Sequence, residues 1–213
     1  MEDSYLHKGL RLKLVNDLRK KGIKSENVLD AINKIPRHCF MDSGFINFAY
    51  KDQAFPIAAG QTISQPFTVA TQTELLDVQK RDKILEVGTG SGYQTAVLIE
   101  MGAMVCSIER YKELYLKAKS ILEELGYRPQ LFYGDGYLGL PTYGPFDKII
   151  ITAAAPKVPE ELLEQLKPGG RLVAPIGSSG SQKMILVEKS DNDKYQFSEH
   201  GYFVFVPMLK GKE

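Results

Sequence analysis

The sequence predicts an α/β fold, in which a doubly wound, mostly parallel sheet of seven strands carries a helical extension at its N-terminal end. Three observations lead to this prediction. From residue 83 onward, short apolar runs alternate with segments of helical periodicity. A glycine-rich loop follows the first of these apolar runs. Residues 1–60 show no such alternation, so we expect them to form a helical extension packed on a single compact core of residues 61–213.

The N-terminal extension is expected to hold two helices. The first is indicated by leucines at every fourth position, namely Leu6, Leu10, Leu14 and Leu18. Gly22 ends this helix, after basic residues in its last turn. Ser25 can cap a second helix, which Pro36 stops. Residues 40–60 show no clear period and are expected to be loop.

The core is expected to run β-α-β-α-β, then β-α-β, and then two final strands. The seven expected strands are short apolar runs at residues 83–87, 104–108, 130–133, 148–152, 171–176, 183–188 and 201–206. The expected helices lie between them or just before them, at residues 66–77, 93–100, 111–125 and 159–166. Because a polar turn at residues 191–194 separates the last two strands, we expect these to pair antiparallel.

The loop after the first core strand is the main candidate for a ligand site, because ligands bind at the carboxyl edge of such sheets. Gly88, Gly90 and Gly92 let its backbone approach a ligand closely. The dinucleotide fingerprint would need glycine where Tyr93 stands, and the Gly-Lys-Ser/Thr ending of a phosphate-binding loop is absent. The Glu86 carboxylate would repel a pyrophosphate but suits a cationic cofactor such as S-adenosylmethionine (AdoMet).

Two further acids close the next two strands of the predicted sheet. Glu109 can accept hydrogen bonds from both hydroxyls of a ribose, which fits AdoMet and NAD equally. Asp135 can accept a hydrogen bond from an adenine amino group. Either acid alone could be a solvated loop carboxylate. Together with Glu86 they place acids at three successive strand ends, which favours a nucleoside-containing cofactor.

An uncharged segment rich in hydroxyl and amide groups precedes the core, Gly60-Gln61-Thr62-Ile63-Ser64-Gln65-Pro66-Phe67. Pro66 opens an expected helix, with Ser64 or Gln65 at its cap position. Free backbone N–H groups and the positive end of the helix dipole would make this start a site for an anion. The alternative is an ordinary serine cap without a ligand.

The order of these motifs resembles the class I AdoMet-dependent methyltransferases, which have a Rossmann-like fold. The Lys167-Pro168-Gly169-Gly170 turn before a strand is also widespread there, and we interpret it as scaffold. More specifically, residues 60–66 upstream of residues 85–96 resemble the protein-L-isoaspartate O-methyltransferase family. The other matching motifs lie at residues 134–136, 145–147, 152–156 with 158–159, and 205–208. Residues 209–213 lie where family enzymes vary, and no contact from them is predicted.

The resemblance implies methylation of the free carboxylate of isoaspartyl residues in damaged proteins, with AdoMet as donor. It assigns the active-site role to Ser64 and cofactor contacts to Glu109, Asp135 and Gly136. Acceptor contacts are expected from Thr62, Ser64 and Ala154. The full set of expected cofactor contacts is Gln61, Thr62, Ile63, Ser64, Glu86, Gly88, Thr89, Gly90, Ser91, Gly92, Glu109, Arg110, Gly134, Asp135 and Gly136.

This chemistry needs no general base, because a carboxylate with a pKa of about 4 is already ionised at neutral pH. We expect catalysis to come chiefly from positioning, with Ser64 and Thr62 orienting the carboxylate. The histidines His7, His38 and His200 are scattered and fall in no motif, so no metal is predicted. Two cysteines are too few for a disulfide framework, and Cys106 is expected to be a core thiol.

Composition narrows the possible partners. The net charge is +1 in 213 residues, and no apolar run is long enough to span a membrane. Residues 1–19 are rich in charge and lack the apolar stretch of a signal peptide, so none is expected. We therefore expect a cytoplasmic, monomeric protein that binds neither nucleic acid nor membrane. A methyltransferase for RNA or a small molecule, and a non-catalytic AdoMet- or nucleotide-binding module, remain alternatives; an NAD oxidoreductase is disfavoured by Tyr93.

Overall fold

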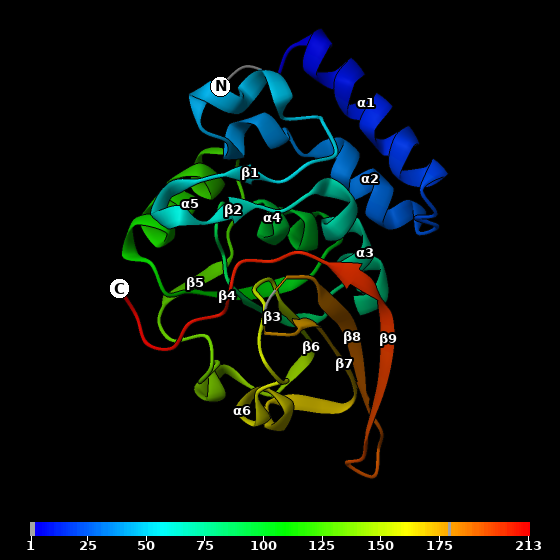
Figure 1. Ribbon diagram of the computed structural model, residues 1–213, viewed down its shortest axis with the longest axis vertical. Coiled ribbons are helices and arrows are strands. Elements are labelled where there is room, and N and C mark those ends of the chain that lie inside the picture. The colour runs from blue at the N-terminus through cyan, green and yellow to red at the C-terminus, as the bar shows by residue number, and fades with distance from the viewer. Residues whose placement is uncertain (1–2, 179) are drawn as a thin grey trace.

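The computed structural model describes residues 3–178 and 180–213, and a seven-stranded sheet forms its centre. The strands of this sheet are β3 (Lys83–Val87), β4 (Met104–Glu109), β5 (Gln130–Tyr133), β6 (Phe146–Ile151), β7 (Leu166–Ile176), β8 (Gln182–Lys189) and β9 (Tyr195–Phe203). Their spatial order is β5-β4-β3-β6-β7-β8-β9 (Figure 1). The first five are parallel, and β8 and β9 add antiparallel. The predicted fold class is confirmed.

The strand order reverses beside β3, because the chain moves outward to β4 and β5 and then returns to place β6 on the other side of β3. At such a reversal the connections leave in opposite directions and open a crevice above the carboxyl ends of the strands. The glycine loop after β3 lies at this crevice. The topology thus brings together the ends of β3, β4 and β6.

Helices cover both faces of the sheet, and their bounds are α1 (Tyr5–Lys20), α2 (Glu26–Lys34), α3 (Pro66–Leu76), α4 (Tyr93–Glu100), α5 (Lys112–Glu124) and α6 (Glu160–Glu164). Figure 1 shows α3, α4 and α5 on one face, with α1 and α2 stacked beyond them, and α6 on the other face. No helix within the described part of the chain is both long and apolar enough to cross a bilayer.

Alternation along the central strands explains how both faces become buried. On β3, Ile84 packs in a cluster with residues of α3 and α4, whereas Leu85 and Val87 belong to the cluster on the α6 face. On β6, Ile150 faces the first cluster and Ile149 the second. Successive side chains of a strand point to opposite faces, so a continuous apolar run is what a doubly covered sheet requires.

The N-terminal helices form as predicted, but the face that α1 buries differs from the prediction. Leu14 and Leu18 are buried, whereas Leu6 and Leu10 are exposed, with 69% and 37% of their surface accessible. Arg11 and Val15 are buried in their place. The nine-residue α2 packs against the 16-residue α1, and Arg11 Nε of α1 donates to the Asn33 carbonyl of α2.

Short elements occupy the segment that was expected to be loop. They are the 3-10 helices η1 (Arg37–Phe40), η2 (Ser43–Phe48) and η3 (Ala58–Gly60), followed by the antiparallel pair β1 (Phe55–Pro56) and β2 (Thr62–Ile63). A further 3-10 turn, η4 (Pro141–Tyr143), follows β5. None of these reaches the length at which hydrophobic periodicity becomes visible in a sequence.

Two strand boundaries were predicted wrongly. β7 starts at Leu166 and includes the Lys-Pro-Gly-Gly segment, because Leu166 pairs with Phe146 before the register shifts. β9 spans Tyr195–Phe203 rather than residues 201–206. This strand lies at the edge of the sheet and alternates polar side chains, which hid it, whereas Val206 leaves the sheet and accepts a hydrogen bond from Ala154 N–H at 2.8 Å.

Candidate active site

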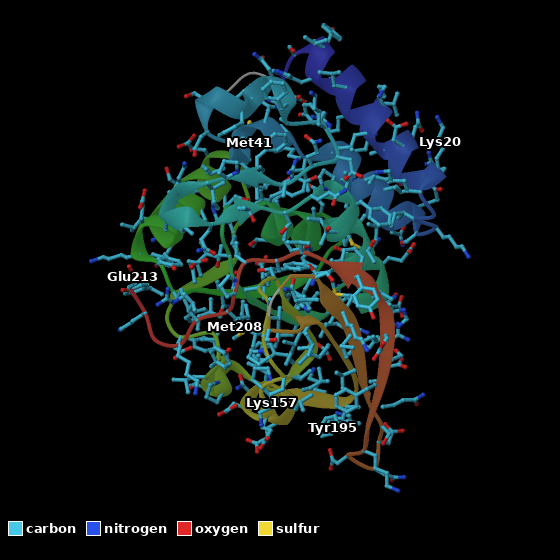
Figure 2. All side chains as sticks on the ribbon, viewed as in Figure 1. Lys20, Met41, Lys157, Tyr195, Met208 and Glu213 are labelled. Carbon is cyan, nitrogen blue, oxygen red and sulfur yellow. The ribbon has the colours of Figure 1, made fainter. Side chains whose placement is uncertain are left out.

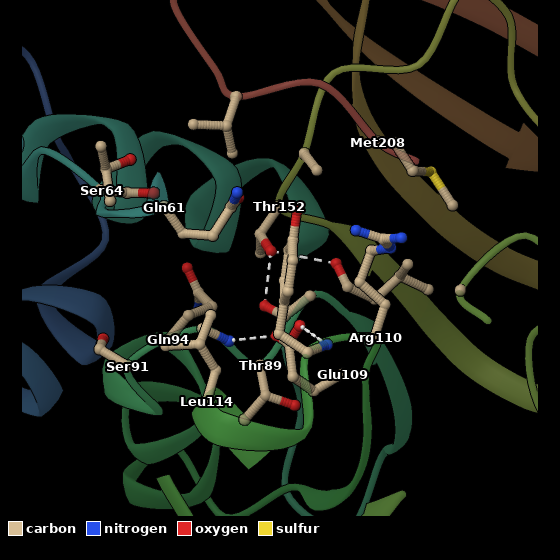
Figure 3. A pocket seen from close by; sticks show the side chains of 18 of the residues that line it. Gln61, Ser64, Thr89, Ser91, Gln94, Glu109, Arg110, Leu114, Thr152 and Met208 are labelled. Carbon is tan, nitrogen blue, oxygen red and sulfur yellow. Dashed lines mark hydrogen bonds between the residues drawn. The ribbon is translucent and has the colours of Figure 1, made fainter. Parts of the chain in front are cut away.

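A pocket lies over the carboxyl ends of β3, β4 and β6, with about 830 Å³ of open space including its mouth. Ser64 and Gln61 lie on the α3 side of the pocket, and Glu109 and Arg110 lie across it (Figure 3). The predicted site residues that line it are Gln61, Thr62, Ile63, Ser64, Gly88, Thr89, Gly90, Ser91, Glu109, Arg110 and Gly136.

The glycine loop needs its glycines for two separate reasons. Gly88 has a φ of +97°, and a Cβ there would lie 2.5 Å from Thr152 Oγ1. Thr152 Oγ1 lies so close because it donates to the carbonyl of Gly88, at 2.7 Å. Gly92 has a φ of +88° and begins α4, where a Cβ would meet Leu122 at 3.1 Å. Thus Gly88 shapes the pocket floor, whereas Gly92 lies outside the pocket lining and serves helix packing.

Glu109 joins the loop to the end of β4. Its Oε2 accepts the N–H of Gly90 at 2.8 Å, and its Oε1 accepts the N–H of Tyr111 at 2.9 Å. The side chain is buried yet borders the pocket. Each carboxylate oxygen can accept more than one hydrogen bond, so both still have capacity for a ligand. The loop therefore fixes this carboxylate in a position where it can receive two hydroxyl groups.

Glu86 does not line the pocket, contrary to its prediction as a cofactor contact. It is fully buried behind the loop, where Thr95 Oγ1 donates to its Oε2. Burial raises its pKa from 4.5 to about 8, although hydrogen bonds from Thr95 and Ser107 act in the opposite direction. At neutral pH the side chain is therefore mostly an uncharged acid. The argument that its charge would select a cationic cofactor does not hold.

Asp135 also lies outside the pocket lining, because the C-terminal residues engage it. Its Oδ2 accepts the N–H of Gly211 at 2.6 Å. The same tail reaches Arg110: the N–H of Glu213 donates to the Arg110 carbonyl at 2.7 Å, and the two side chains form an ion pair at 3.3 Å. Figure 2 shows the tail running from Met208 near the middle of the molecule to Glu213 at its edge. These contacts of residues 209–213 were not predicted from the sequence.

The acceptor side of the pocket is formed by the segment before α3. Thr62 and Ser64 line the pocket, and both also line a second, open groove beside β9. Thr152 and Val206 are the other residues shared by the two cavities. Among the residues described, the Ser64 hydroxyl has no hydrogen-bond partner. It is therefore available to a group that enters from either side.

The start of α3 is not the open anion site that was predicted. Gln65 occupies the cap position without a side-chain cap, and the carboxylate of Asp52 instead accepts the N–H of Phe67 at 2.8 Å. Asp52 also pairs with Lys21 at 2.5 Å. A side chain from a remote segment thus already supplies the negative charge that the helix end attracts. Sequence alone does not reveal a cap that comes from 15 residues away.

Other predicted and unpredicted residues can now be placed. Gly134 and Ala154 lie outside the lining; Ala154 instead bridges to Pro207, and its neighbour Ala153 borders the pocket. The lining residues that were not predicted as cofactor or acceptor contacts are Val69, Val87, Tyr93, Gln94, Ile108, Tyr111, Leu114, Thr152, Ala153, Val206, Pro207, Met208 and Leu209. Thr152 had a usable signal, since it follows β6 at the same edge as the glycine loop.

Two of the three histidines are not scattered in space. The rings of His7 and His38 stack at 3.9 Å, and potential ligand atoms of these histidines and Asp3 lie within 4.8 Å of one another. However, both oxygens of Asp3 already accept from the guanidinium of Arg11, at 3.0 Å each. His7 Nδ1 accepts the N–H of Ser4. This cluster lies apart from the pocket lining and binds together the N-terminal helices.

Comparison with known proteins gives consistent matches along the chain. Residues 10–213 match the family model described as protein-L-isoaspartate(D-aspartate) O-methyltransferase. A relative from Christiangramia forsetii, named protein-L-isoaspartate O-methyltransferase, is 58% identical over 213 residues, which is 100% of both chains.

Solved structures agree with this match. One that carries the same name has a TM-score of 0.83 at 32% identity, covering 92% of this chain and 65% of its own. Another, a putative protein-L-isoaspartate O-methyltransferase from Plasmodium falciparum in complex with S-adenosyl-L-homocysteine, has a TM-score of 0.82 at 24% identity, covering 94% and 98%. The second likeness concerns the fold alone.

Proposed function

The chain belongs to the protein-L-isoaspartate(D-aspartate) O-methyltransferase family, and we propose that it uses the pocket beside Ser64 to methylate isoaspartyl residues in damaged proteins. It is an AdoMet-dependent protein carboxyl O-methyltransferase. The acceptor is the free α-carboxylate that remains when an aspartyl or asparaginyl residue rearranges. The methyl ester then closes spontaneously to a succinimide with loss of methanol, and part of the succinimide reopens as normal aspartate.

One observation carries the proposal: Ser64 borders both the pocket over the glycine loop and the groove beside β9. A methyltransferase must bring a bound donor and a large acceptor together at one point. The glycine loop and Glu109 line the pocket, and the groove runs beside β9, where a peptide could lie. Thr62, Ser64, Thr152 and Val206 border the place where the two meet.

The pocket fits AdoMet by the chemistry of its lining. Glu109 offers carboxylate oxygens suited to the ribose hydroxyls. Gly88 and Gly136 let the backbone that borders the pocket pack tightly, since a Cβ at either would lie 2.5 Å from Thr152 or Val87, respectively. We assign the cofactor to these residues together with the other predicted residues of the lining. AdoMet supplies an electrophilic methyl group on a sulfonium centre.

Ser64 and Thr62 are assigned to orient the acceptor. The Ser64 hydroxyl can donate to one carboxylate oxygen and leave the other oxygen free to attack the methyl carbon. A new O–CH₃ bond forms as the S–CH₃ bond breaks, and the two charges cancel. No proton moves, so the site needs no base, and alignment supplies the rate enhancement.

The remaining assignments concern the whole chain. We propose that residues 1–60 form an extension of the core of residues 61–213, supported by one apolar cluster that joins α1 and α2 to α4 and α5. We propose that the chain acts as a monomer. We also propose that the protein acts in the cytoplasm, where AdoMet and ageing proteins are both found. No nucleic acid, membrane or metal takes part in this proposal.

The test compares two peptides that differ at one residue. The enzyme is incubated with methyl-labelled AdoMet and a peptide containing L-isoaspartate, beside the same peptide with normal aspartate. We expect label on the first peptide only, and we expect mild base to release it, because methyl esters hydrolyse readily. Equal labelling of both peptides, or base-stable label, would contradict the proposal.

A further inference from the structure

Arg37 is a buried cation without a counter-ion. It lies on η1 with 0% of its surface exposed, and no carboxylate forms an ion pair with it among residues 3–178 and 180–213. Buried charges are normally paired, because removing an ion from water is costly. A full positive charge that is held in the interior without a partner therefore needs an explanation. Burial lowers the pKa of the Arg37 guanidinium, but an arginine side chain keeps its charge at neutral pH in proteins.

The contacts of Arg37 are neutral ones. Its Nε donates to the carbonyl of Ala49 at 3.0 Å, and its Nη2 donates to the carbonyl of Ser64 at 2.9 Å. The guanidinium lies over the ring of Tyr93, 4.7 Å from its centroid. Its Nη1 has no hydrogen-bond partner in the described part of the chain. These dipoles and the ring solvate the charge partly, but they do not neutralise it.

The surrounding acids are already committed. Asp52 is the acid whose charge acts most on Arg37, but its carboxylate pairs with Lys21 and caps α3 through Phe67. Asp3 pairs with Arg11 through both of its oxygens. The region behind the acceptor segment therefore carries one positive charge more than the described groups around it balance.

This charge lies directly behind the proposed acceptor position. Arg37 holds the carbonyl of Ser64, the residue that borders both cavities, and Tyr93 under its guanidinium lines the pocket. Arg110, the arginine that lines the pocket, is engaged by the C-terminal tail across from Ser64. Since Asp52 occupies the N-terminus of α3, the helix end offers little attraction to a second anion.

We propose that Arg37 is a positioning residue that selects an anionic acceptor: its hydrogen bond fixes the Ser64 segment, and its unbalanced charge favours a carboxylate over a neutral group there. This inference rests on the proposed function and names the source of its charge selectivity. The substrate's α-carboxylate would be the counter-ion that the folded chain lacks.

The kinetic consequence has a definite sign. The carboxylate loses charge as its oxygen bonds to the methyl group, so a nearby cation stabilises the bound substrate more than the transition state. Removing the cation should then raise KM and raise kcat slightly, because the bound substrate loses more stabilisation than the transition state does. A purely structural role would instead lower kcat or impair cofactor binding as well.

The experiment uses Arg37→Gln, Arg37→Lys and the wild-type enzyme, each saturated with S-adenosylhomocysteine (AdoHcy). Affinity is measured for an L-isoaspartyl peptide and for the same peptide with its free α-carboxylate replaced by a carboxamide. We expect the wild type to prefer the carboxylate by about tenfold or more, and Arg37→Gln to lose most of that preference. Arg37→Lys, which keeps the charge, should retain much of it. KM of Arg37→Gln should rise about tenfold while kcat changes less than about threefold.

Three results would overturn the inference: no carboxylate preference in the wild type, an undiminished preference in Arg37→Gln, or equal loss of affinity for both peptides. If Arg37→Gln fails to bind AdoHcy, Arg37→Lys decides: a retained preference supports the inference, and a lost one overturns it. Methyl transfer by the wild type keeps the two proposals apart. No transfer to the isoaspartyl peptide ends the proposed function, whereas transfer with an unaltered preference in Arg37→Gln ends only this inference.

Discussion

The centre of the cofactor side, the glycine loop and the end of β4, comes from a short part of the chain, whereas the acceptor side is held by remote segments. On the cofactor side, the loop with Gly88 and Gly90 and the end of β4 with Glu109 lie within 22 residues of one another and hold each other by direct hydrogen bonds. On the acceptor side, Ser64 is held by Arg37. The helix behind it is capped by Asp52. This difference predicts that substitutions on the cofactor side change AdoHcy affinity, whereas substitutions on the acceptor side change the turnover of the peptide.

The largest expected effect is a change in stability caused by Glu86, which is buried behind the glycine loop. The raised pKa of Glu86, from 4.5 to about 8, means that the folded state binds a proton more tightly than the unfolded state does. The contribution of Glu86 to the free energy of unfolding is therefore largest below pH 4.5. This contribution decreases as the pH rises from 4.5 to 8. Glu86→Gln keeps the neutral form and should be more stable than the wild type at pH 8 by roughly 4 kcal/mol.

Urea unfolding at pH 5 and pH 8 measures this difference, with the exposed Glu123→Gln as the control. The stability gain of Glu86→Gln should appear at pH 8 and shrink toward zero at pH 5. A gain of the same size at both pH values would show that Glu86 is not a neutral acid in the fold.

The next effect concerns the loop itself. Gly88→Ala would place a Cβ 2.5 Å from Thr152 Oγ1 at a φ of +97°, so the pocket floor must shift. AdoHcy affinity, measured by calorimetry, should fall by about 100-fold or more. Gly126→Ala is the matched control, because its φ is +85° but no atom lies within 4 Å of the new Cβ. It should cost about 1 kcal/mol of stability and leave AdoHcy affinity intact; equal affinity losses in both variants would refute the steric argument.

A smaller effect is expected on the acceptor side. Ser64→Ala removes the hydroxyl that orients the carboxylate, so the turnover of an isoaspartyl peptide should fall by about 10- to 50-fold. Thr71→Ala serves as control, since Thr71 also lines the groove but donates to the Phe67 carbonyl within α3. If both variants turn over at the wild-type rate, Ser64 does not orient the acceptor.

The smallest effect concerns the cap behind Ser64. Asp52→Ala leaves the N–H of Phe67 without its acceptor and should cost about 1 kcal/mol in thermal or urea unfolding. Asp52→Asn keeps an acceptor and should cost only a few tenths of a kcal/mol, because asparagine caps nearly as well. If the two variants lose the same stability, the ion pair with Lys21 rather than the cap is what matters.

The same contrast explains how much the sequence could predict. The sheet, its strands from β3 to β8 and the loop residues Gly88 and Gly90 follow from local patterns: apolar alternation and glycine at tight approaches. The burial of Glu86 could not be predicted, because a position at a strand end does not reveal which face its side chain takes.

The acceptor side was predictable only as a segment. Residues 60–66 stood out through their composition and family resemblance, but their supports did not. The cap from Asp52, the contact from Arg37 and the docking of the tail on Asp135 are long-range contacts without a local signal. The edge strand β9 was misplaced for a related reason, since one solvent-facing side removed its apolar pattern.

The central claim is that the cofactor side and the acceptor side of the site can be changed independently. The most direct test measures AdoHcy affinity and turnover in both Ser64→Ala and Glu109→Gln. Glu109→Gln should weaken AdoHcy binding by about tenfold or more, because it loses the charge that receives the ribose and holds Gly90. Ser64→Ala should keep AdoHcy affinity within about twofold while its turnover falls. If Ser64→Ala weakens AdoHcy as much as Glu109→Gln does, or if Glu109→Gln leaves it unchanged, the division of the site into two halves is wrong.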